Sequence, residues 1–456
     1  MTRRFITVIL RFALRIFFRR VEVAGLERVP RRGATIFVLN HQNGLVDPAF
    51  LLCYAPRPVS FLAKSTLFRT PVLGFLVRAL DAIPVYRKQD AGEDTSKNRE
   101  TFTRAHNLLK SGGTIGVCPE GVSHNESSLR PLKSGTARIA LGAASTGDAL
   151  DLKIVPAGLY YTAKTMFRSS ALLYFGEPVR VEPVTLDADD EPPREAVQEL
   201  SEHIARALRE ATLNAEHHEA LTTIARAERI FSSDDGVAAA SGGQTLSREM
   251  KLKRRFVEGY AFHRANSPAR LAALEARIRG YEEELAQAGV DIDHLSPANL
   301  SKYGGVGHLV TRGLLFLLLL PLAVFGAAVH YPAYRLGGFF ATKFSRSYDD
   351  IVSTIKVISA LLLFPLTWLV IMATCFVFGG WQAALVSLVV APLAGYVAMR
   401  FAEELDRFVA GTKAAAFFIT ERRFFRQLLV ERRAIREEII ALGEEAERAG
   451  ALQTTV

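Results

Sequence analysis

The sequence predicts an α/β domain with a central mixed sheet flanked by helices, followed by a helical linker and a C-terminal region of transmembrane helices. Short apolar runs that end in polar or glycine-containing turns alternate with helical stretches between residues 21 and 215, which is typical of α/β domains. Residues 357–399 contain no Asp, Glu, Lys or Arg. Of the 456 residues, 49% are apolar, and the mean hydropathy of +0.15 indicates membrane-embedded segments.

Charge and cysteine content exclude several classes of protein. The net charge of +9 is a modest basic excess, which suits an anionic membrane surface or a phosphorylated substrate better than a nucleic acid. The three cysteines, Cys53, Cys118 and Cys375, are widely spaced and make neither a disulfide framework nor a four-ligand zinc site. We therefore expect a reducing compartment, no bound metal and no nucleic-acid partner.

Residues 1–20 contain six arginines and no acidic residue, interleaved with apolar side chains. On a helix, Arg4, Arg11, Arg15 and Arg19 fall within a narrow arc and leave a broad apolar face. This pattern predicts an amphipathic helix in the membrane interface, with phenylalanines in the lipid and arginines at anionic headgroups. The alternative is a core helix with an exposed arginine stripe.

Within residues 21–215 the pattern predicts one domain with alternating strands and helices. We expect strands at residues 34–40, 58–64, 114–121, 153–161 and 171–179. We expect helices near Asp47–Tyr54, Pro71–Leu80, Lys97–Lys110, Gly135–Ala144 and Glu195–Leu213.

Residues 216–305 are expected to form a linker and charged helices, with a small-residue stretch at Ser232–Ser247 and a helical run from Lys251 to Gln287. Residues 306–402 form the expected membrane region, in which 357–378 and 381–400 are each long enough to span a bilayer and make a hairpin. The segment 308–340 carries Pro321 and Gly326, so it either spans or re-enters the membrane. Residues 403–456 read as a charged helical tail.

The distribution of basic residues predicts the topology. Both flanks of the hairpin are basic: Lys343, Arg346 and Lys356 precede it, and Arg400, Arg407, Arg422 and Arg423 follow it. Both ends are therefore expected on the cytoplasmic side. A third full span would place the N-terminal domain on the opposite face, so the re-entrant interpretation of 308–340 is favoured, with the α/β domain cytoplasmic.

The segment FVLNHQNGLVDPAFL carries the first chemical signal. His41 and Asp47 flank a short polar turn after an apolar strand. A histidine beside a carboxylate is the minimum apparatus for taking a proton from a hydroxyl. The alternative is a capping role, with Asp47 as the N-cap residue ahead of Pro48 in the next helix.

Three further segments follow within about 120 residues. Lys64, Arg69 and Arg87 lie at predicted strand ends, where cations suit a phosphate. Glu120-Gly121 follows a strand in VCPEGVSHNESSLRPLKSG, with Lys133 just before a helix, and IVPAGLYY ends another strand. Each segment alone has an ordinary structural explanation, but the occurrence of all four in this order is informative.

Together these segments resemble the glycerol-phosphate and lysophospholipid acyltransferase family, over roughly residues 23–179. The first segment (Asn-His-x-Asn-x-x-x-Asp-Pro), and the third, which continues through His124 and LRPLKSG, are most similar to the yeast-type glycerol 3-phosphate and dihydroxyacetone phosphate acyltransferases. The resemblance implies an acyltransferase domain at residues 21–215 and a role in phospholipid biosynthesis.

The resemblance also implies the roles of individual residues. His41 would be the general base and Asp47 its orienting partner. The implied substrate-binding residues are Lys64, Arg87 and Lys133 for the acceptor phosphate, and Glu120 with Gly121 for the glycerol backbone. The implied co-substrate is acyl-CoA or acyl carrier protein, with no other cofactor. The acceptor would be glycerol 3-phosphate, dihydroxyacetone phosphate or lysophosphatidate, at a membrane.

The sequence departs from the family pattern at two points. Five residues separate His41 from Asp47 where four are usual, and Val122-Ser123 follows the Pro-Glu-Gly where Thr-Arg is usual. Lys133 or Arg130 must then replace the missing arginine.

Three further expectations concern the reaction. The backbone N–H of Gly121 is the candidate donor to an oxyanion. Cys118, inside an apolar run, is expected to be inert rather than a nucleophile beside His124. The alternative function is a non-catalytic lipid carrier or scaffold with an acyltransferase-like domain, which would be expected to have lost one of the residues that stand intact here.

Overall fold

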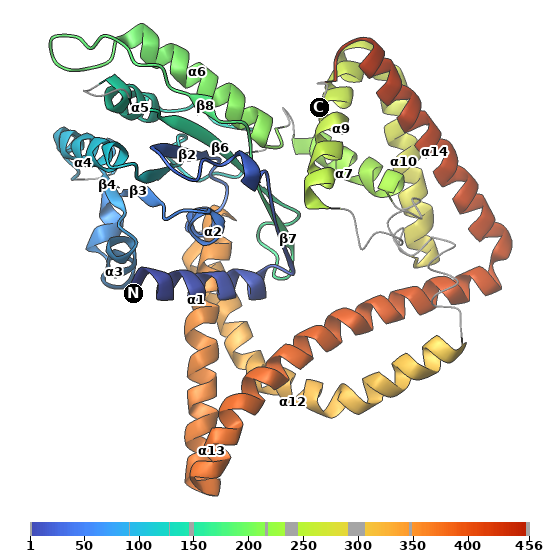
Figure 1. Cartoon of the computed structure of the whole chain (residues 1–456). Helices are drawn as coiled ribbons and strands as arrows, with labels where there is room; N and C mark the ends of the chain where they lie inside the picture. Colours follow the sequence, from blue (N-terminus) through green and yellow to red (C-terminus); the bar gives the residue numbers. More distant parts are fainter. Residues whose placement is uncertain are drawn as a thin grey trace. The chain divides into compact units, whose positions relative to one another are not determined.

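The computed structural model describes residues 2–90, 92–126, 128–145, 150–214, 218–232, 245–290, 306–345 and 349–452. The chain divides into two compact units, which are described separately. The first comprises Met1–Asn214 together with Ala341–Val357, and the second comprises Ala215–Phe340 together with Ile358–Val456 (Figure 1).

The first unit is built on an eight-stranded mixed sheet with the order β1-β7-β6-β2-β5-β3-β4, and β8 pairs with β6. All neighbouring strands are parallel except β6 with β7 and β6 with β8. The strands are β1 (Arg20–Ala24), β2 (Thr35–Leu39), β3 (Ser60–Lys64), β4 (Ile83–Val85), β5 (Thr114–Val117), β6 (Lys153–Tyr161), β7 (Ser170–Phe175) and β8 (Val179–Arg180).

The five predicted strands are present, and the run at 171–179 contributes to two strands. The prediction missed β1 and β4. Each is short, β1 carries Glu22 and β4 carries Pro84, so neither shows a clear apolar run.

The five predicted helices of this unit are also confirmed: α2 (Val46–Tyr54), α3 (Pro71–Ala79), α4 (Asn98–Lys110), α5 (Gly135–Ser145) and α6 (Arg194–Ala211). Helices α4, α5 and α6 bury Leu109, Ile139 and Ile204 in one core with Ile36 and Val38 of β2. Successive side chains of a strand point to opposite faces, so Phe37 packs elsewhere, against Phe175 of β7.

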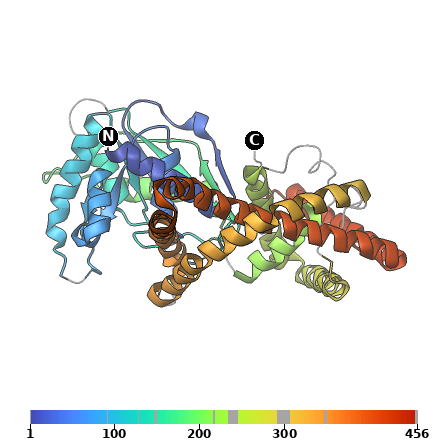
Figure 2. The same cartoon turned by 90° about the horizontal axis from the view of Figure 1, so that it is seen from below.

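Helix α1 (Thr2–Phe17) packs on the same unit, with Leu14 and Phe17 buried. Phe18, just after it, is 1% exposed; its ring stacks on Tyr161 and packs tilted against Phe50. Figure 2, seen from below, shows α1 in front of the sheet. The helix is therefore partly a core helix.

The arginines and apolar side chains of α1 are not divided as the sequence predicted. Arg3 donates to the carbonyl oxygens of Leu80 and Val59, and Arg11 donates to the carbonyl oxygen of Cys53. These two arginines thus bind the domain, and the expectation that Arg11 meets headgroups is wrong. An apolar face remains exposed, formed by Phe5, Val8, Ile9 and Phe12.

In the second unit, four helices share one apolar core (Figure 1): α7 (His218–Ser232), α9 (Leu246–Asn266), α10 (Pro268–Ala288) and α14 (Arg422–Arg448). The predicted linker region and the charged tail are thus packed together. The single helical run predicted at Lys251–Gln287 is two helices, because Pro268 begins α10 and supplies no N–H to continue α9. Most of Ser232–Ser247 lies outside the described residues.

Helix α12 (Val306–Ser345) runs for 40 residues through Pro321 and Pro332 without a break. That residues 308–340 either span or re-enter the membrane stays a prediction. Helix α13 (Asp349–Thr420) is interrupted at Gly380, where φ is 73° and ψ is −173°. This break confirms the predicted division of residues 357–400. By length and composition, both helices are suited to crossing a membrane, and their most apolar windows are only 11% and 0% buried. They indicate a membrane-associated protein.

Candidate active site

The site lies where three parallel strands end side by side. Strand β2 lies between β5 and β6 and is parallel to both. His41 comes just after β2, Cys118 follows β5 directly, and Tyr161 is the last residue of β6. The carboxyl ends of parallel strands in an α/β sheet are the usual place for ligands and catalytic side chains, so the fold brings these residues together.

The predicted pair of His41 and Asp47 is formed. His41 Nδ1 lies 3.0 Å from Asp47 Oδ2. The Asp47 carboxylate is fully buried and also accepts hydrogen bonds from the Asn43 N–H, at 2.7 Å, and from the Tyr161 hydroxyl, at 2.6 Å. Three donors therefore compensate its burial, as an ionised buried carboxylate requires.

The capping interpretation of Asp47 is wrong. Helix α2 has Leu45 at the N-cap position, and Asp47 bonds backwards to the Asn43 N–H rather than forwards into the helix. The extra residue between His41 and Asp47 is accommodated in a turn in which the N–H groups of Val46 and Asp47 both donate to the Asn43 carbonyl oxygen. The longer spacing thus still places the histidine on the carboxylate.

The environment of His41 prepares it to take a proton. Burial disfavours the imidazolium, but the neighbouring Cys118 sulfur and the Asp47 carboxylate outweigh burial and hold the pKa of His41 well above 6.5. With Nδ1–H donating to Asp47, Nε2 carries the lone pair that accepts a proton. The His41 side chain is 18% exposed, so a substrate reaches it.

Tyr161 stays protonated as a donor to Asp47. Burial is the main cause that raises the pKa of its hydroxyl well above the ordinary value, and the adjacent Asp47 charge raises it further. The Tyr161 ring also packs on Phe18 and Phe50. It thereby ties the carboxylate to the aromatic core beside the sheet.

Glu120 and His124 hold the backbone of His41. The His41 N–H donates to Glu120 Oε1 at 2.8 Å, and the His124 N–H donates to the His41 carbonyl oxygen at 3.0 Å. Glu120 Oε2 accepts from the Arg130 N–H at 2.9 Å and from His124 Nε2. Glu120 is 2% exposed, so in this structure it positions the base, and its expected contact with glycerol stays a prediction.

The predicted phosphate-binding cations lie around Gly121. Arg87 binds the Asp90 carboxylate through Nε and Nη2, both at 2.9 Å, and its Nη1 donates to the Gly121 carbonyl oxygen at 2.6 Å. Lys64 Nζ lies 3.4 Å from Asp90. A Cβ on Gly121 would lie 3.4 Å from Lys133 Cγ, so the Lys133 stem passes over this glycine. The structure thus brings Lys64, Arg87, Gly121 and Lys133 together.

Asp90 occupies the centre of these cations as an anion. Hydrogen bonding to Arg87 is the largest cause that lowers the pKa of Asp90, and the charges of Arg87 and Lys64 add to it. Arg69, the third cation of this predicted segment, is paired separately with Glu93 at 2.8 Å. A cluster that holds a carboxylate with a bidentate arginine is also suited to a phosphate.

Gly121 forms a turn in which its own N–H is already engaged, and its expected contact with glycerol stays a prediction. Its φ of 76° is the left-handed conformation of a turn that favours glycine. Its N–H donates to the Cys118 carbonyl oxygen at 3.0 Å, so the expectation that this N–H binds an oxyanion is wrong. Cys118 itself lies beyond the end of β5, half-buried, and interacts with His41 rather than with His124.

Sequence reasoning missed the roles of Tyr161, His124 and Asp90. Tyr161 and His124 lie inside segments that were singled out, but no local spacing pairs them with Asp47 or Glu120. Asp90 follows Arg87 by three residues in a polar stretch, a spacing that carries no signal without the fold.

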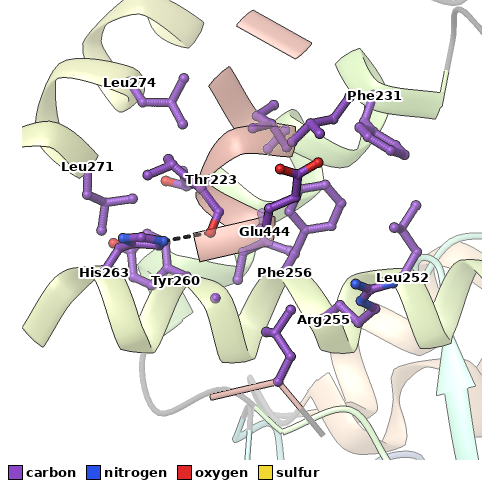
Figure 3. Close-up of a pocket in the computed structure, with 18 of the residues that line it drawn as sticks. Thr223, Phe231, Leu252, Arg255, Phe256, Tyr260, His263, Leu271, Leu274 and Glu444 are labelled. Atoms are coloured by element: carbon purple, nitrogen blue, oxygen red, sulfur yellow. Dashed lines mark hydrogen bonds between the residues drawn. The ribbon is translucent and has the colours of Figure 1, made fainter. Parts of the chain in front are cut away.

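The second unit contains a cavity of about 230 Å³ lined mainly by apolar side chains of α7, α9, α10 and α14 (Figure 3). Its histidine, His263, is 2% exposed. Both ring nitrogens are used, since Nε2 lies 2.9 Å from the Leu442 carbonyl oxygen and Nδ1 lies 2.8 Å from the Ser267 hydroxyl. His263 therefore has no nitrogen left for a substrate.

Comparison with known families agrees with this division of the chain. Residues 20–160 match the Acyltransferase family, and residues 240–447 match the Glycerol-3-phosphate acyltransferase 2 C-terminal domain. The predicted resemblance to this family is confirmed.

Two curated relatives from Saccharomyces cerevisiae are similar to this chain. Glycerol-3-phosphate O-acyltransferase 1 is 28% identical over 77% of this chain and 58% of the relative. Glycerol-3-phosphate O-acyltransferase 2 is 28% identical over 59% of this chain and 37% of the relative. The chain thus spans about half the length of these curated relatives.

A solved structure, the 1-acyl-sn-glycerophosphate (LPA) acyltransferase PlsC from Thermotoga maritima, is 21% identical. The likeness covers 46% of this chain and 80% of that chain, with a TM-score of 0.33. This likeness is too low to bear on the site.

Proposed function

We propose that this protein is a membrane-bound O-acyltransferase. The premise is that residues 20–160 match the Acyltransferase family and residues 240–447 match the Glycerol-3-phosphate acyltransferase 2 C-terminal domain. The protein transfers a fatty acyl group from a thioester to a hydroxyl of glycerol 3-phosphate in glycerolipid synthesis. The observation that carries the proposal is the 3.0 Å contact between His41 Nδ1 and the buried Asp47 carboxylate, next to a cation cluster.

The reaction requires one base and good positioning. His41 Nε2 takes the proton of the acceptor hydroxyl while the oxygen attacks the thioester carbonyl carbon. The tetrahedral intermediate collapses, the carbon–sulfur bond breaks, and the imidazolium returns its proton to the leaving thiolate. Asp47 remains ionised and stabilises the imidazolium. Such a base increases the rate roughly 10²–10⁴-fold. Positioning of the two substrates lowers the activation barrier by about 7–11 kcal/mol.

The acceptor phosphate binds at the cations around Gly121. Arg87 and Lys64 already hold the Asp90 carboxylate, and a phosphate offers the same acceptor geometry with more charge. Acceptor binding therefore displaces Asp90 from Arg87. Lys133, whose stem passes over Gly121, supplies the third cation.

Glycerol 3-phosphate is proposed over lysophosphatidate because the two curated relatives carry the name glycerol-3-phosphate O-acyltransferase. The donor is acyl-CoA or acyl carrier protein, and no cofactor takes part. The acyltransferase domain faces the cytoplasm, in agreement with the basic flanks of residues 357–400.

An acyl-transfer assay tests the proposal. Purified full-length protein in vesicles is given labelled acyl-CoA and acyl carrier protein with glycerol 3-phosphate, dihydroxyacetone phosphate or lysophosphatidate. We expect transfer to glycerol 3-phosphate that His41→Ala abolishes. No transfer with any acceptor, together with lipid binding that His41→Ala leaves unchanged, would instead identify the non-catalytic carrier or scaffold.

A further inference from the structure

The loop that carries the base is held by a segment about 310 residues further along the chain. Residues 351–357, the start of α13, belong to the same compact unit as the sheet. The Leu45 N–H donates to Thr354 Oγ1 at 3.0 Å. Ser353 Oγ donates to the Lys164 carbonyl oxygen. Ser353 is 0% and Thr354 8% exposed, so neither hydroxyl is a surface group.

Thr354 supplies the hydrogen-bond acceptor for the Leu45 N–H. Leu45 is the N-cap residue of α2, and no side chain of its own loop caps that helix. A backbone N–H that is removed from water and has no partner destabilises the conformation that holds it. Because Leu45 lies two residues before Asp47, the hydroxyl of Thr354 fixes the backbone from which the catalytic carboxylate projects.

Ser353 acts on the same loop through the β6–β7 connection. Its partner, the Lys164 carbonyl oxygen, also accepts from Asn43 Nδ2 at 3.5 Å. The Lys164 ammonium group donates to the Gln42 carbonyl oxygen at 3.2 Å. Lys356 donates to the next carbonyl oxygen, that of Thr165, at 2.8 Å. Residues 353–356, Lys164 and the His41–Asp47 loop thus form one hydrogen-bonded assembly.

We infer that Ser353 and Thr354 are positioning residues that hold the His41–Asp47 loop in its reactive geometry, and through it tie the base to the membrane segment. The inference rests on the proposed function. The charge-free stretch begins at Val357, three residues after Thr354, which is about 4.5 Å along a helix. The contact lies within the sheet unit, at the start of the helix that continues into the charge-free stretch.

The test uses full-length protein in vesicles and the variants Thr354→Val and Ser353→Ala. A displacement of about 1 Å at a reacting group costs on the order of 100-fold, and we expect each variant to lose roughly tenfold in kcat. The KM values of donor and acceptor should stay unchanged, and Thr354→Ser should restore kcat. The matched control is Thr367→Val, because the Thr367 hydroxyl donates to the Leu363 carbonyl oxygen of its own helix at 2.9 Å.

A second measurement does not depend on turnover. Amide hydrogen exchange of a peptide covering residues 42–48 should be faster in Thr354→Val than in wild type, with exchange in β3 unchanged. The inference is overturned if the double variant Ser353→Ala, Thr354→Val keeps the wild-type kcat, if either single variant raises the acceptor KM at constant kcat, or if exchange is unchanged. If the wild-type protein transfers acyl groups to no acceptor, but exchange is still faster in Thr354→Val than in wild type, the proposed function is refuted. The contact between Thr354 and the loop is then still supported.

Discussion

At the scale of single residues, the site is a set of polar groups whose partners restrict each of them to one role. Asp47 accepts hydrogen bonds from three donors, Tyr161 stays a donor, and Glu120 has both oxygens engaged by backbone or ring N–H groups. In the proposed reaction, His41 exchanges a proton with the acceptor through Nε2, and the Cys118 side chain is hydrogen-bonded to the same imidazole.

The raised pKa of His41 predicts the pH dependence of catalysis. The neutral imidazole is the active form, so kcat/KM should rise with pH as His41 deprotonates, with a midpoint above 6.5. Asp47→Asn removes the carboxylate charge that raises this pKa, so the midpoint should move to lower pH. Its kcat should fall by about 10²–10⁴-fold. An acid limb that Asp47→Asn leaves in place would assign the titration to another group.

Cys118 lies beside His41, and the mechanism gives its thiol no covalent step. Cys118→Ala should therefore keep kcat close to the wild-type value, because the acceptor hydroxyl attacks the thioester directly. Rapid-quench trapping with labelled acyl-CoA should yield no acyl-enzyme. A loss of turnover in Cys118→Ala as large as that in His41→Ala would point to an acyl-cysteine intermediate.

Asp90 and the cations that bind it should have opposite effects on the acceptor. Replacing Lys64, Arg87 or Lys133 by Met should raise the acceptor KM by about 10–100-fold, since a charged hydrogen bond to phosphate is lost. Asp90→Asn removes the competitor for Arg87, so the acceptor KM should fall by about 2–5-fold. The donor KM is the internal control. A raised acceptor KM in Asp90→Asn would mean that Asp90 orients Arg87 instead.

At the scale of single elements, α1 has two functions in one helix. Phe17 and the following Phe18 fill the core of the sheet domain, and β1 begins at Arg20. Deleting residues 2–20 would therefore remove part of the core and would not isolate a membrane contact. The exposed apolar face with Phe5 and Phe12, which are 67% and 59% exposed, is separable by point substitution.

The double variant Phe5→Ser, Phe12→Ser should lower activity on acyl donors presented in a bilayer. Each phenylalanine loses burial worth about 1.5–3 kcal/mol in the interface. Activity on a short-chain, water-soluble acyl thioester should be unchanged, and the protein should stay in the membrane fraction. Met166→Ser, at a residue 63% exposed in the same unit, is the control. Equal losses with both donors would contradict the membrane role of this face.

At the scale of the whole molecule, the path of α12 through the membrane stays a prediction. Its length and composition suit it to crossing, and a full crossing would place its two ends on opposite faces. The re-entrant path that the basic flanks of residues 357–400 favour would leave both ends on one face.

Cysteine labelling tests this path. In a variant with Cys53, Cys118 and Cys375 replaced by Ser, we expect Gly307→Cys and Lys343→Cys to react with an impermeant reagent from the same face of oriented vesicles. Gly379→Cys, beside the break at Gly380, should react from the other face. Labelling of Gly307→Cys and Lys343→Cys from opposite faces would show that α12 spans the membrane.

The sequence by itself determined the strands and helices around the site, the His41–Asp47 pair and the division of the apolar C-terminal stretch. These features depend on local periodicity and on motifs a few residues long. Only the tertiary structure decided that Tyr161 and Glu120 support the pair, that Asp90 holds Arg87, and that the Thr354 hydroxyl accepts from the Leu45 N–H ahead of Asp47. Those contacts join residues that are far apart in the sequence and that the parallel strands and the start of α13 bring together. A hydrogen bond between two distant segments leaves no periodic pattern in the sequence of either segment.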